Sequence, residues 1–146
     1  MRSLRRNFDL LASNLEAFKD LPDLVFVSEI WIYSDEIEHY YLPGYKFHAI
    51  RNDTYPSGGV GVFVKAKFNC DVCSISMSSA DTIKITVTLG NELFRFVCIY
   101  RLLSQPINDF LTEFAQYLTT EKIQNLILCG DYNLDTLQPS TYIENY

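Results

Sequence analysis

The segment L-I-L-C-G-D-Y-N, residues 126–133, is apolar for four residues, reaches a glycine at position 130, and then presents Asp131 and Asn133. A short apolar run that ends at a glycine predicts a buried strand, here over residues 125–129, because it is too short for a helix. Glycine allows a sharp backbone turn, aspartate can orient or deprotonate a water molecule, and asparagine can both donate and accept hydrogen bonds. The segment therefore predicts a buried strand that ends in groups able to position water for attack on phosphorus.

Outward from this segment, the apolar residues follow helical spacing in two places and strand spacing elsewhere. Spacing of three and four residues predicts helices over 4–18 and 107–118, with Ser104 as the N-cap of the second and Pro106 near its first turn. Shorter apolar or alternating runs predict strands over 24–28, 45–51, 60–64, part of 70–76, 83–89 and 93–100. Gly90-Asn91 predicts a hairpin between the last two. Because hairpins join antiparallel strands, the sequence predicts a mixed α/β (α+β) fold and not a purely parallel sheet.

Length and composition indicate one globular domain over residues 1–146 with a substantial core, since 48% of the residues are hydrophobic. No apolar run is long enough to cross a membrane, and the first residues lack the apolar core of a signal peptide. We therefore expect a soluble, intracellular chain with no membrane partner. We expect Cys98 and Cys129 to be buried thiols, and Cys70 and Cys73 to be reduced and structural, because no second ligand pair follows for zinc.

The formal net charge of −6 argues against strong non-specific binding to a polyanion. Phosphate neutralisation by Lys and Arg supplies most of such binding, and this chain has an excess of acidic residues. Contact with nucleic acid would then need a local basic patch or a bound metal ion.

Polar side chains follow three of the predicted strands. They are Glu29 after the strand 24–28, Tyr100 and Arg101 at the end of 93–100, and Asp131 and Asn133 after 125–129. Ligands of α/β proteins gather beyond the carboxyl ends of strands. Two carboxylates at one rim indicate a hard cation such as Mg²⁺, which keeps several waters and takes further oxygen ligands from substrate phosphates. Arg101 and the Tyr100 hydroxyl would donate to phosphate oxygens. The alternative is that these residues only end strands and face solvent.

Several short motifs, in this order and spacing, resemble the endonuclease/exonuclease/phosphatase superfamily. The resemblance is greatest to the apurinic/apyrimidinic-type endonuclease domain of non-LTR retrotransposons, and it covers nearly the whole chain. The motifs are R-S-L-R-R-N-F-D at 2–9, S-E-I-W at 28–31, L-P-G-Y at 42–45, R-N-D-T-Y-P-S-G-G-V-G-V-F-V at 51–64, I-Y-R at 99–101 and G-D-Y-N at 130–133.

This resemblance implies a fold and a set of roles. The implied fold is a four-layer α/β sandwich, and the implied reaction is phosphodiester hydrolysis with a divalent cation, usually magnesium. Glu29 matches the metal-binding glutamate, Tyr100 the active-site tyrosine, Asp131 the aspartate that activates or orients water, and Asn133 the asparagine beside it. The implied partners are DNA, which the domain nicks, and the reverse transcriptase domain of the same polyprotein; the implied location is the nucleus.

The chain also departs from the family pattern at both ends. The family has an active-site asparagine upstream of the segment matched here by 2–4, and a Ser-Asp-His motif well after G-D-x-N. We therefore expect an incomplete sandwich, truncated at the N- and C-termini. His39 and His48 match no catalytic position, and we expect them on the surface or in loops. Two alternatives to a DNA-nicking endonuclease stay open: an inactive remnant of that domain, and a phosphoesterase acting on phospholipid or inositol phosphate.

Overall fold

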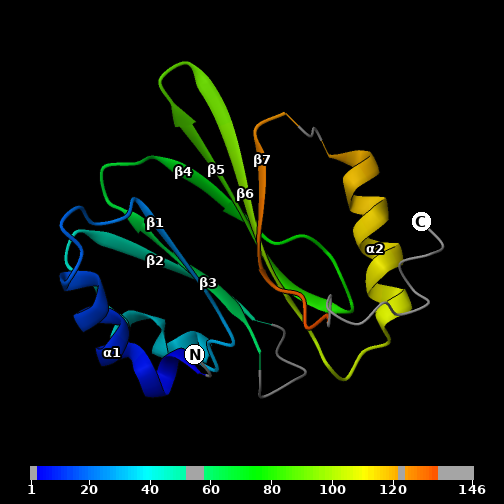
Figure 1. Cartoon of the computed structure of the whole chain (residues 1–146), viewed down its shortest axis with the longest axis horizontal. Coiled ribbons are helices and arrows are strands. Elements are labelled where there is room, and N and C mark those ends of the chain that lie inside the picture. The colour runs from blue at the N-terminus through cyan, green and yellow to red at the C-terminus, as the bar shows by residue number, and fades with distance from the viewer. Residues whose placement is uncertain (1–2, 52–57, 122–123, 135–146) are drawn as a thin grey trace.

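Two β-sheets pack face to face, and helices cover their outer faces (Figure 1). The computed structural model describes residues 3–51, 58–121 and 124–134. Its elements are α1 (Leu4–Glu16), β1 (Leu24–Ser28), the 3₁₀ helix η1 (Ser34–His39), β2 (Tyr45–Ile50), β3 (Val60–Lys65), β4 (Cys70–Cys73), β5 (Ala80–Leu89), β6 (Glu92–Arg101), α2 (Ile107–Thr120) and β7 (Leu126–Asp131). The predicted mixed α/β fold class, with two sheets packed face to face, is confirmed.

The two sheets differ in how their strands are joined. The first has the order β1-β3-β2 and the second the order β4-β5-β6-β7. All neighbours are antiparallel except β6 and β7, which run parallel. A parallel pair needs a crossover connection, and α2 supplies it between β6 and β7. As a result β6 and β7 end at the same edge of the second sheet, with Tyr100 opposite Asp131.

The main apolar layer lies between the two sheets. Alternate residues of β3 and β5 point into it, namely Val60, Val62 and Val64 from the first sheet and Ile83, Ile85 and Val87 from the second. Side chains alternate between the faces of a strand, so the period-two pattern of these strands puts one apolar face on each sheet. A second apolar layer joins α1 to the first sheet, and a third joins α2 to the second sheet (Figure 1).

Several local predictions were wrong. The first helix ends at Glu16, so Phe18 lies beyond it and is 59% exposed, outside the buried stripe. The second helix begins at Ile107 with Pro106 as its N-cap, so Ser104 is too far upstream to cap it. His48 lies half-buried in β2 and is not a loop or surface residue. Residues 52–57 of the glycine-rich motif lie outside the described residues.

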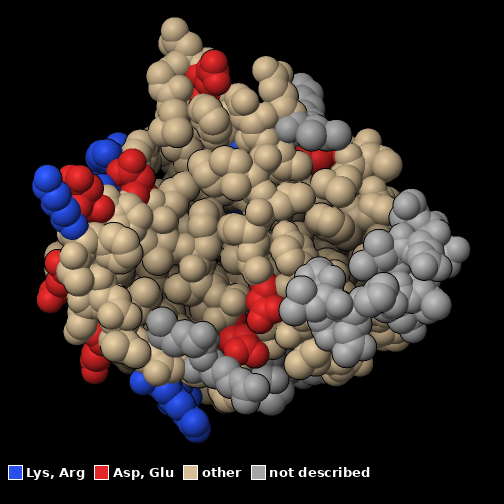
Figure 2. Space-filling model, viewed as in Figure 1, with Lys and Arg blue, Asp and Glu red and all other residues tan. Residues whose placement is uncertain are grey.

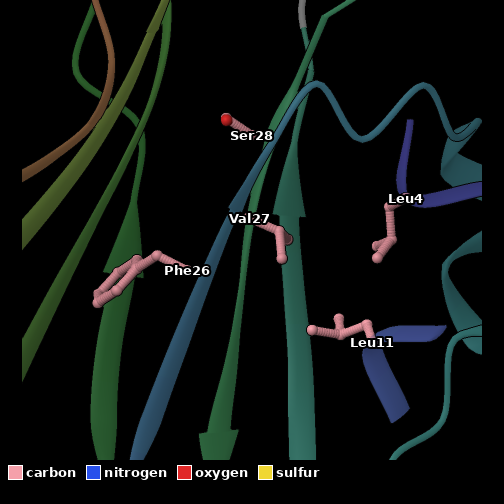
Figure 3. A pocket seen from close by; sticks show the side chains of 5 residues that line it. All are labelled: Leu4, Leu11, Phe26, Val27 and Ser28. Atoms are coloured by element: carbon pink, nitrogen blue, oxygen red, sulfur yellow. The ribbon is translucent and has the colours of Figure 1, made fainter. Parts of the chain in front are cut away.

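A pocket of about 220 Å³ opens between α1 and the edge strand β1. Leu4, Leu11 and Val27 point toward one another across it, whereas Phe26 points to the opposite side of the strand (Figure 3). Of the described residues that line it, only Ser28 is polar. None of the described helices is long and apolar enough to cross a membrane.

Candidate active site

Four of the five residues that the sequence singled out meet around the hydroxyl of Tyr100. This hydroxyl donates a hydrogen bond to Glu29 Oε1 at 2.9 Å, which joins the two sheets at their rim. Asn133 contributes a side-chain hydrogen bond to Tyr100, and the charge of Asp131 acts on the same ring. Figure 2 shows acidic side chains beside each other on the face where Figure 1 places the ends of β1 and β7. The structure therefore brings the three strand ends to one place.

The hydroxyl of Tyr100 stays protonated over the physiological pH range. Burial, together with the hydrogen bond to Glu29 and the negative charges nearby, raises the pKa of Tyr100 to about 12. The side-chain hydrogen bond of Asn133 acts in the opposite direction and is outweighed. A tyrosine held in this state is a hydrogen-bond donor and not a general base.

Glu29 reaches this position by an unusual backbone conformation. It directly follows β1 and has a φ of 53°, in the left-handed region. A residue with a Cβ atom in this region costs about 1–2 kcal/mol relative to the usual conformation. The turn directs the half-buried carboxylate toward Tyr100, where a strand that simply continued would have presented it on one face of the sheet.

Gly130 has a different role from the one predicted. The predicted strand ended at Cys129, but β7 continues through Gly130 to Asp131. Gly130 has a φ of 130°, and a Cβ atom here would lie 1.9 Å from the carbonyl oxygen of Ile99 on β6. The glycine is therefore needed for close approach of two backbones within the sheet. Because β7 is not interrupted, Asp131 is held beside Tyr100 by strand pairing.

The segment after β7 is fixed by its own polar groups. The backbone N–H of Asn133 donates to Asp131 Oδ1 at 2.9 Å, which is the local turn that aspartate favours. The Asn133 side chain donates through Nδ2 to the carbonyl oxygen of Arg101 at 2.8 Å. Asp131 itself is exposed, whereas Asn133 is half-buried. The carboxylate thus faces solvent from a backbone that is held on both sides.

Arg101 is placed differently from the expectation of direct phosphate contact. Its side chain is buried, and Nε and Nη2 donate to the carbonyl oxygens of Tyr132 and Asn133, each at 2.8 Å. Nη1 donates to the carbonyl oxygens of Leu102 and Gln105. These bonds direct the guanidinium to backbone groups. We assign Arg101 the role of holding the segment that carries Asp131 and Asn133.

The donor set fits a magnesium ion that takes most of its ligands from water and substrate. Within residues 3–51, 58–121 and 124–134, no group of three or more His, Cys, Asp or Glu side chains is placed to hold a metal. Magnesium commonly binds through only one or two protein carboxylates and completes its shell with water and phosphate oxygens. Glu29, with its oxygen atoms at the rim, is the carboxylate that would hold it.

One buried carboxylate near the site was missed in the sequence. Asp81 in β5 is 4% exposed and lies opposite Tyr100 in the β5–β6 pairing. The sequence does indicate this position. Asp81 is two and four residues before Ile83 and Ile85, so the alternation of side chains along a strand puts it on the same, apolar face. A buried charge in such a position is rare without a partner.

Comparison with solved structures identifies the fold. No protein-family model and no curated protein sequence matches the chain. TDP2 from D. rerio, complexed with single-strand DNA product, matches with a TM-score of 0.63 and 17% identity, covering 90% of this chain and 55% of that one. The endonuclease domain of TRAS1, a telomere-specific non-LTR retrotransposon, matches with a TM-score of 0.60 and 13% identity, covering 94% and 56%. The human nocturnin catalytic domain with bound sulfate anion matches with a TM-score of 0.59 and 16% identity, covering 89% of this chain and 57% of that one.

These comparisons bear on the resemblance seen in the sequence. All three proteins are members of the endonuclease/exonuclease/phosphatase superfamily, although their identity to this chain is low. The chain spans somewhat over half the length of each of them. The predicted resemblance is confirmed at the level of the fold: this chain has the architecture of the endonuclease/exonuclease/phosphatase superfamily.

Proposed function

We propose that the chain is a divalent-metal-dependent phosphodiester hydrolase that nicks DNA, of the kind carried by non-LTR retrotransposons. The observation that carries the proposal is the position of the Tyr100 hydroxyl. It donates to Glu29, which follows β1 of one sheet, and it lies within the influence of Asn133 and of the charge of Asp131 at the end of β7 in the other sheet. A metal-binding carboxylate, a neutral donor and an exposed carboxylate within one rim are the groups that hydrolysis of a phosphodiester requires.

Each side chain has a role in this proposal. Asp131 is exposed and fixed at the end of β7, so it orients the attacking water and accepts its proton. The hydroxyl of Tyr100 remains protonated and donates its one hydrogen to Glu29. With a cation on Glu29, this hydrogen would be free to turn to the phosphate oxygens and stabilise the negative charge that develops there. Asn133 holds the relative positions of Tyr100 and Asp131, and Glu29 would hold the magnesium ion. When bound, that ion would supply Lewis-acid stabilisation of the same charge.

The charge distribution supports a metal in the site. The most exposed basic side chains in Figure 2 lie at the left and lower left edge of this face, whereas acidic side chains lie nearer its middle. A phosphodiester approaching two carboxylates without a cation would be repelled, because like charges a few ångströms apart are unfavourable. A divalent cation on Glu29 would remove this repulsion. Magnesium is therefore the proposed cofactor.

DNA is the proposed substrate because two proteins of this fold are linked to nucleic acid. One is TDP2 complexed with single-strand DNA product, and the other is the endonuclease domain of a non-LTR retrotransposon. The motifs L-P-G-Y at 42–45 and R-S-L-R at 2–5 favour the retrotransposon type over a phospholipid or inositol phosphate esterase. A reverse transcriptase domain in the same polyprotein is the proposed partner, and the nucleus is the proposed location.

The test is nicking of supercoiled plasmid by the full chain in the presence of magnesium. We expect open circles to form, and we expect EDTA or Asp131→Ala to abolish them. Asp71→Ala is the matched control, since Asp71 is an exposed carboxylate on β4 of the same sheet. Nicking that survives EDTA or Asp131→Ala would contradict the mechanism. A folded chain that nicks nothing would contradict the activity and favour the inactive remnant.

A further inference from the structure

Asp81 is a buried carboxylate that the proposed mechanism does not use. It lies near the start of β5 and is 4% exposed. Its Oδ2 atom accepts a hydrogen bond of 2.7 Å from the backbone N–H of Gly59, which precedes β3 in the other sheet. Charge-assisted bonds between a carboxylate and a backbone N–H are among the stronger hydrogen bonds in proteins. Asp81 therefore ties the second sheet to the glycine pair Gly58-Gly59 of the first.

The same glycine pair holds the backbone that follows Glu29. The N–H of Ile30 donates to the carbonyl oxygen of Gly59 at 3.4 Å, and the N–H of Trp31 donates to that of Gly58 at 3.0 Å. A path of hydrogen bonds thus runs from Asp81 through Gly58-Gly59 to the two residues after Glu29. Each step is a bond to backbone, so a shift of the glycine pair would be transmitted to this turn.

Close packing leaves the glycine pair little freedom to move. A Cβ atom on Gly58 would lie 2.7 Å from Oδ2 of Asp81 and 3.6 Å from Cε1 of Tyr100. Asp81 and the ring of Tyr100 therefore both pack against the same side of Gly58, where a side chain would otherwise lie. Asp81 and Tyr100 are themselves paired across β5 and β6. The two residues form a single wall against which the glycine pair is seated.

Glu29 needs such support because its backbone is strained. With a φ of 53° it occupies the left-handed region, as does Trp31 with a φ of 52°. Non-glycine residues persist in this region only where the surrounding structure fixes them. The hydrogen bonds of Ile30 and Trp31 to the glycine pair provide that restraint, and the bond to Asp81 fixes the pair itself.

We propose that Asp81 is a positioning residue that sets the conformation of Glu29 through Gly58-Gly59 and so determines how well Glu29 holds a divalent cation. The part of this inference that concerns cation binding rests on the proposed function. The part that concerns the conformation of Glu29 does not. Asp81 acts on the turn and touches neither metal nor substrate. Its loss should loosen the backbone around Glu29 while the core of the second sheet stays intact.

The first arm of the test measures amide hydrogen exchange in the full chain without metal. In Asp81→Ala, the amides of Gly59 and Trp31 should exchange about 10-fold faster or more, because the restraint on the glycine pair is lost. The amide of Ile85, in the middle of the β5–β6 pairing, should exchange at the wild-type rate. Unchanged exchange at Trp31 would overturn the proposal, as would an equal acceleration at Ile85.

The second arm measures Mn²⁺ binding by electron paramagnetic resonance, with Mn²⁺ as a probe for the divalent site. Asp81→Ala should weaken Mn²⁺ binding by about 10-fold, the lower end of the effects seen when a residue supporting a metal ligand is removed. Asp71→Ala should leave the affinity unchanged. Wild-type affinity in Asp81→Ala would overturn the positioning role. If the wild-type chain bound no Mn²⁺, the proposed function would fail, and the exchange arm would still decide the role of Asp81.

Asp81→Asn is the second variant, and it decides the matter if Asp81→Ala does not fold. Its amide oxygen can still accept from Gly59, so it should keep exchange at Trp31 and the Mn²⁺ affinity within about threefold of wild type. The proposal would be overturned if Asp81→Asn folded but showed the same faster exchange at Trp31 and the same weaker Mn²⁺ binding as expected for Asp81→Ala. The hydrogen bond to Gly59 would then not be what positions Glu29.

Discussion

Replacing Gly130 with alanine should destabilise the protein far more than an ordinary glycine-to-alanine change. The new Cβ atom would lie 1.9 Å from the carbonyl oxygen of Ile99 and 2.7 Å from its nitrogen, both backbone atoms that no rotamer change can move. Forcing β6 and β7 apart costs about 1–3 kcal/mol by analogy with overpacked cores. The φ of 130° adds about 1–3 kcal/mol for a residue with a side chain. We expect the free energy of unfolding to fall by about 2–6 kcal/mol.

Gly90→Ala is the matched control for this prediction. Gly90 also has a positive φ, 63°, but a Cβ atom there would meet nothing within 4 Å. Its cost should be the conformational penalty alone, about 1–2 kcal/mol. Urea denaturation followed by circular dichroism measures both variants against wild type. If Gly130→Ala were no more destabilising than Gly90→Ala, then close approach of β6 and β7 would not be the reason for glycine in G-D-Y-N.

Three further predictions concern polar groups elsewhere in the fold and at the end of β6. Burial alone would raise the pKa of Glu113, but hydrogen bonds from Ser78 and Ser79 lower it; Glu113→Ala should therefore reduce the free energy of unfolding by about 2 kcal/mol in urea denaturation. Burial, with a smaller contribution from Lys46, lowers the pKa of His48 below its usual 6.5. The unfolded chain then takes up a proton first as the pH falls, so stability should be full above about pH 6.5 and decline below it, and His48→Asn should remove that decline. Arg101→Lys should slow nicking by about 10-fold or more while Mn²⁺ affinity stays unchanged, because lysine cannot make the same set of backbone hydrogen bonds.

Strand pattern and residue type were enough to predict the fold class and most of the strands. Alternation in β5 and the continuous apolar run of β3 reflect burial on one or both faces, and burial is what a sequence records directly. The boundaries were less accurate. Phe18 continues the spacing of the first helix, yet the helix ends two residues earlier. The spacing of apolar residues does not show where the packing of a helix against the sheet ends.

The site was predictable in its members but not in its geometry. Strand ends pointed to Glu29, Tyr100, Asp131 and Asn133, and the structure places them around one hydroxyl. Arg101 could not be assigned from sequence, since an arginine that binds phosphate and one that binds backbone carbonyls have the same local pattern. Position 130 requires glycine because Ile99, which is 31 residues earlier in the chain, lies against it on the neighbouring strand. The residues around Gly130 in the sequence do not show this contact.

The central claim is that the strand ends form one catalytic centre, and a double-mutant cycle between Glu29→Gln and Tyr100→Phe tests it most directly. The measurement is the initial rate of plasmid nicking by wild type, both single variants and the double variant, at saturating magnesium. Because Tyr100 donates to Glu29 at 2.9 Å, we expect each single change to slow nicking about 100-fold and the double change to slow it by less than about 1,000-fold. A double variant slowed by the product of the two single effects, about 10,000-fold, would show that the two residues act independently and would contradict the account.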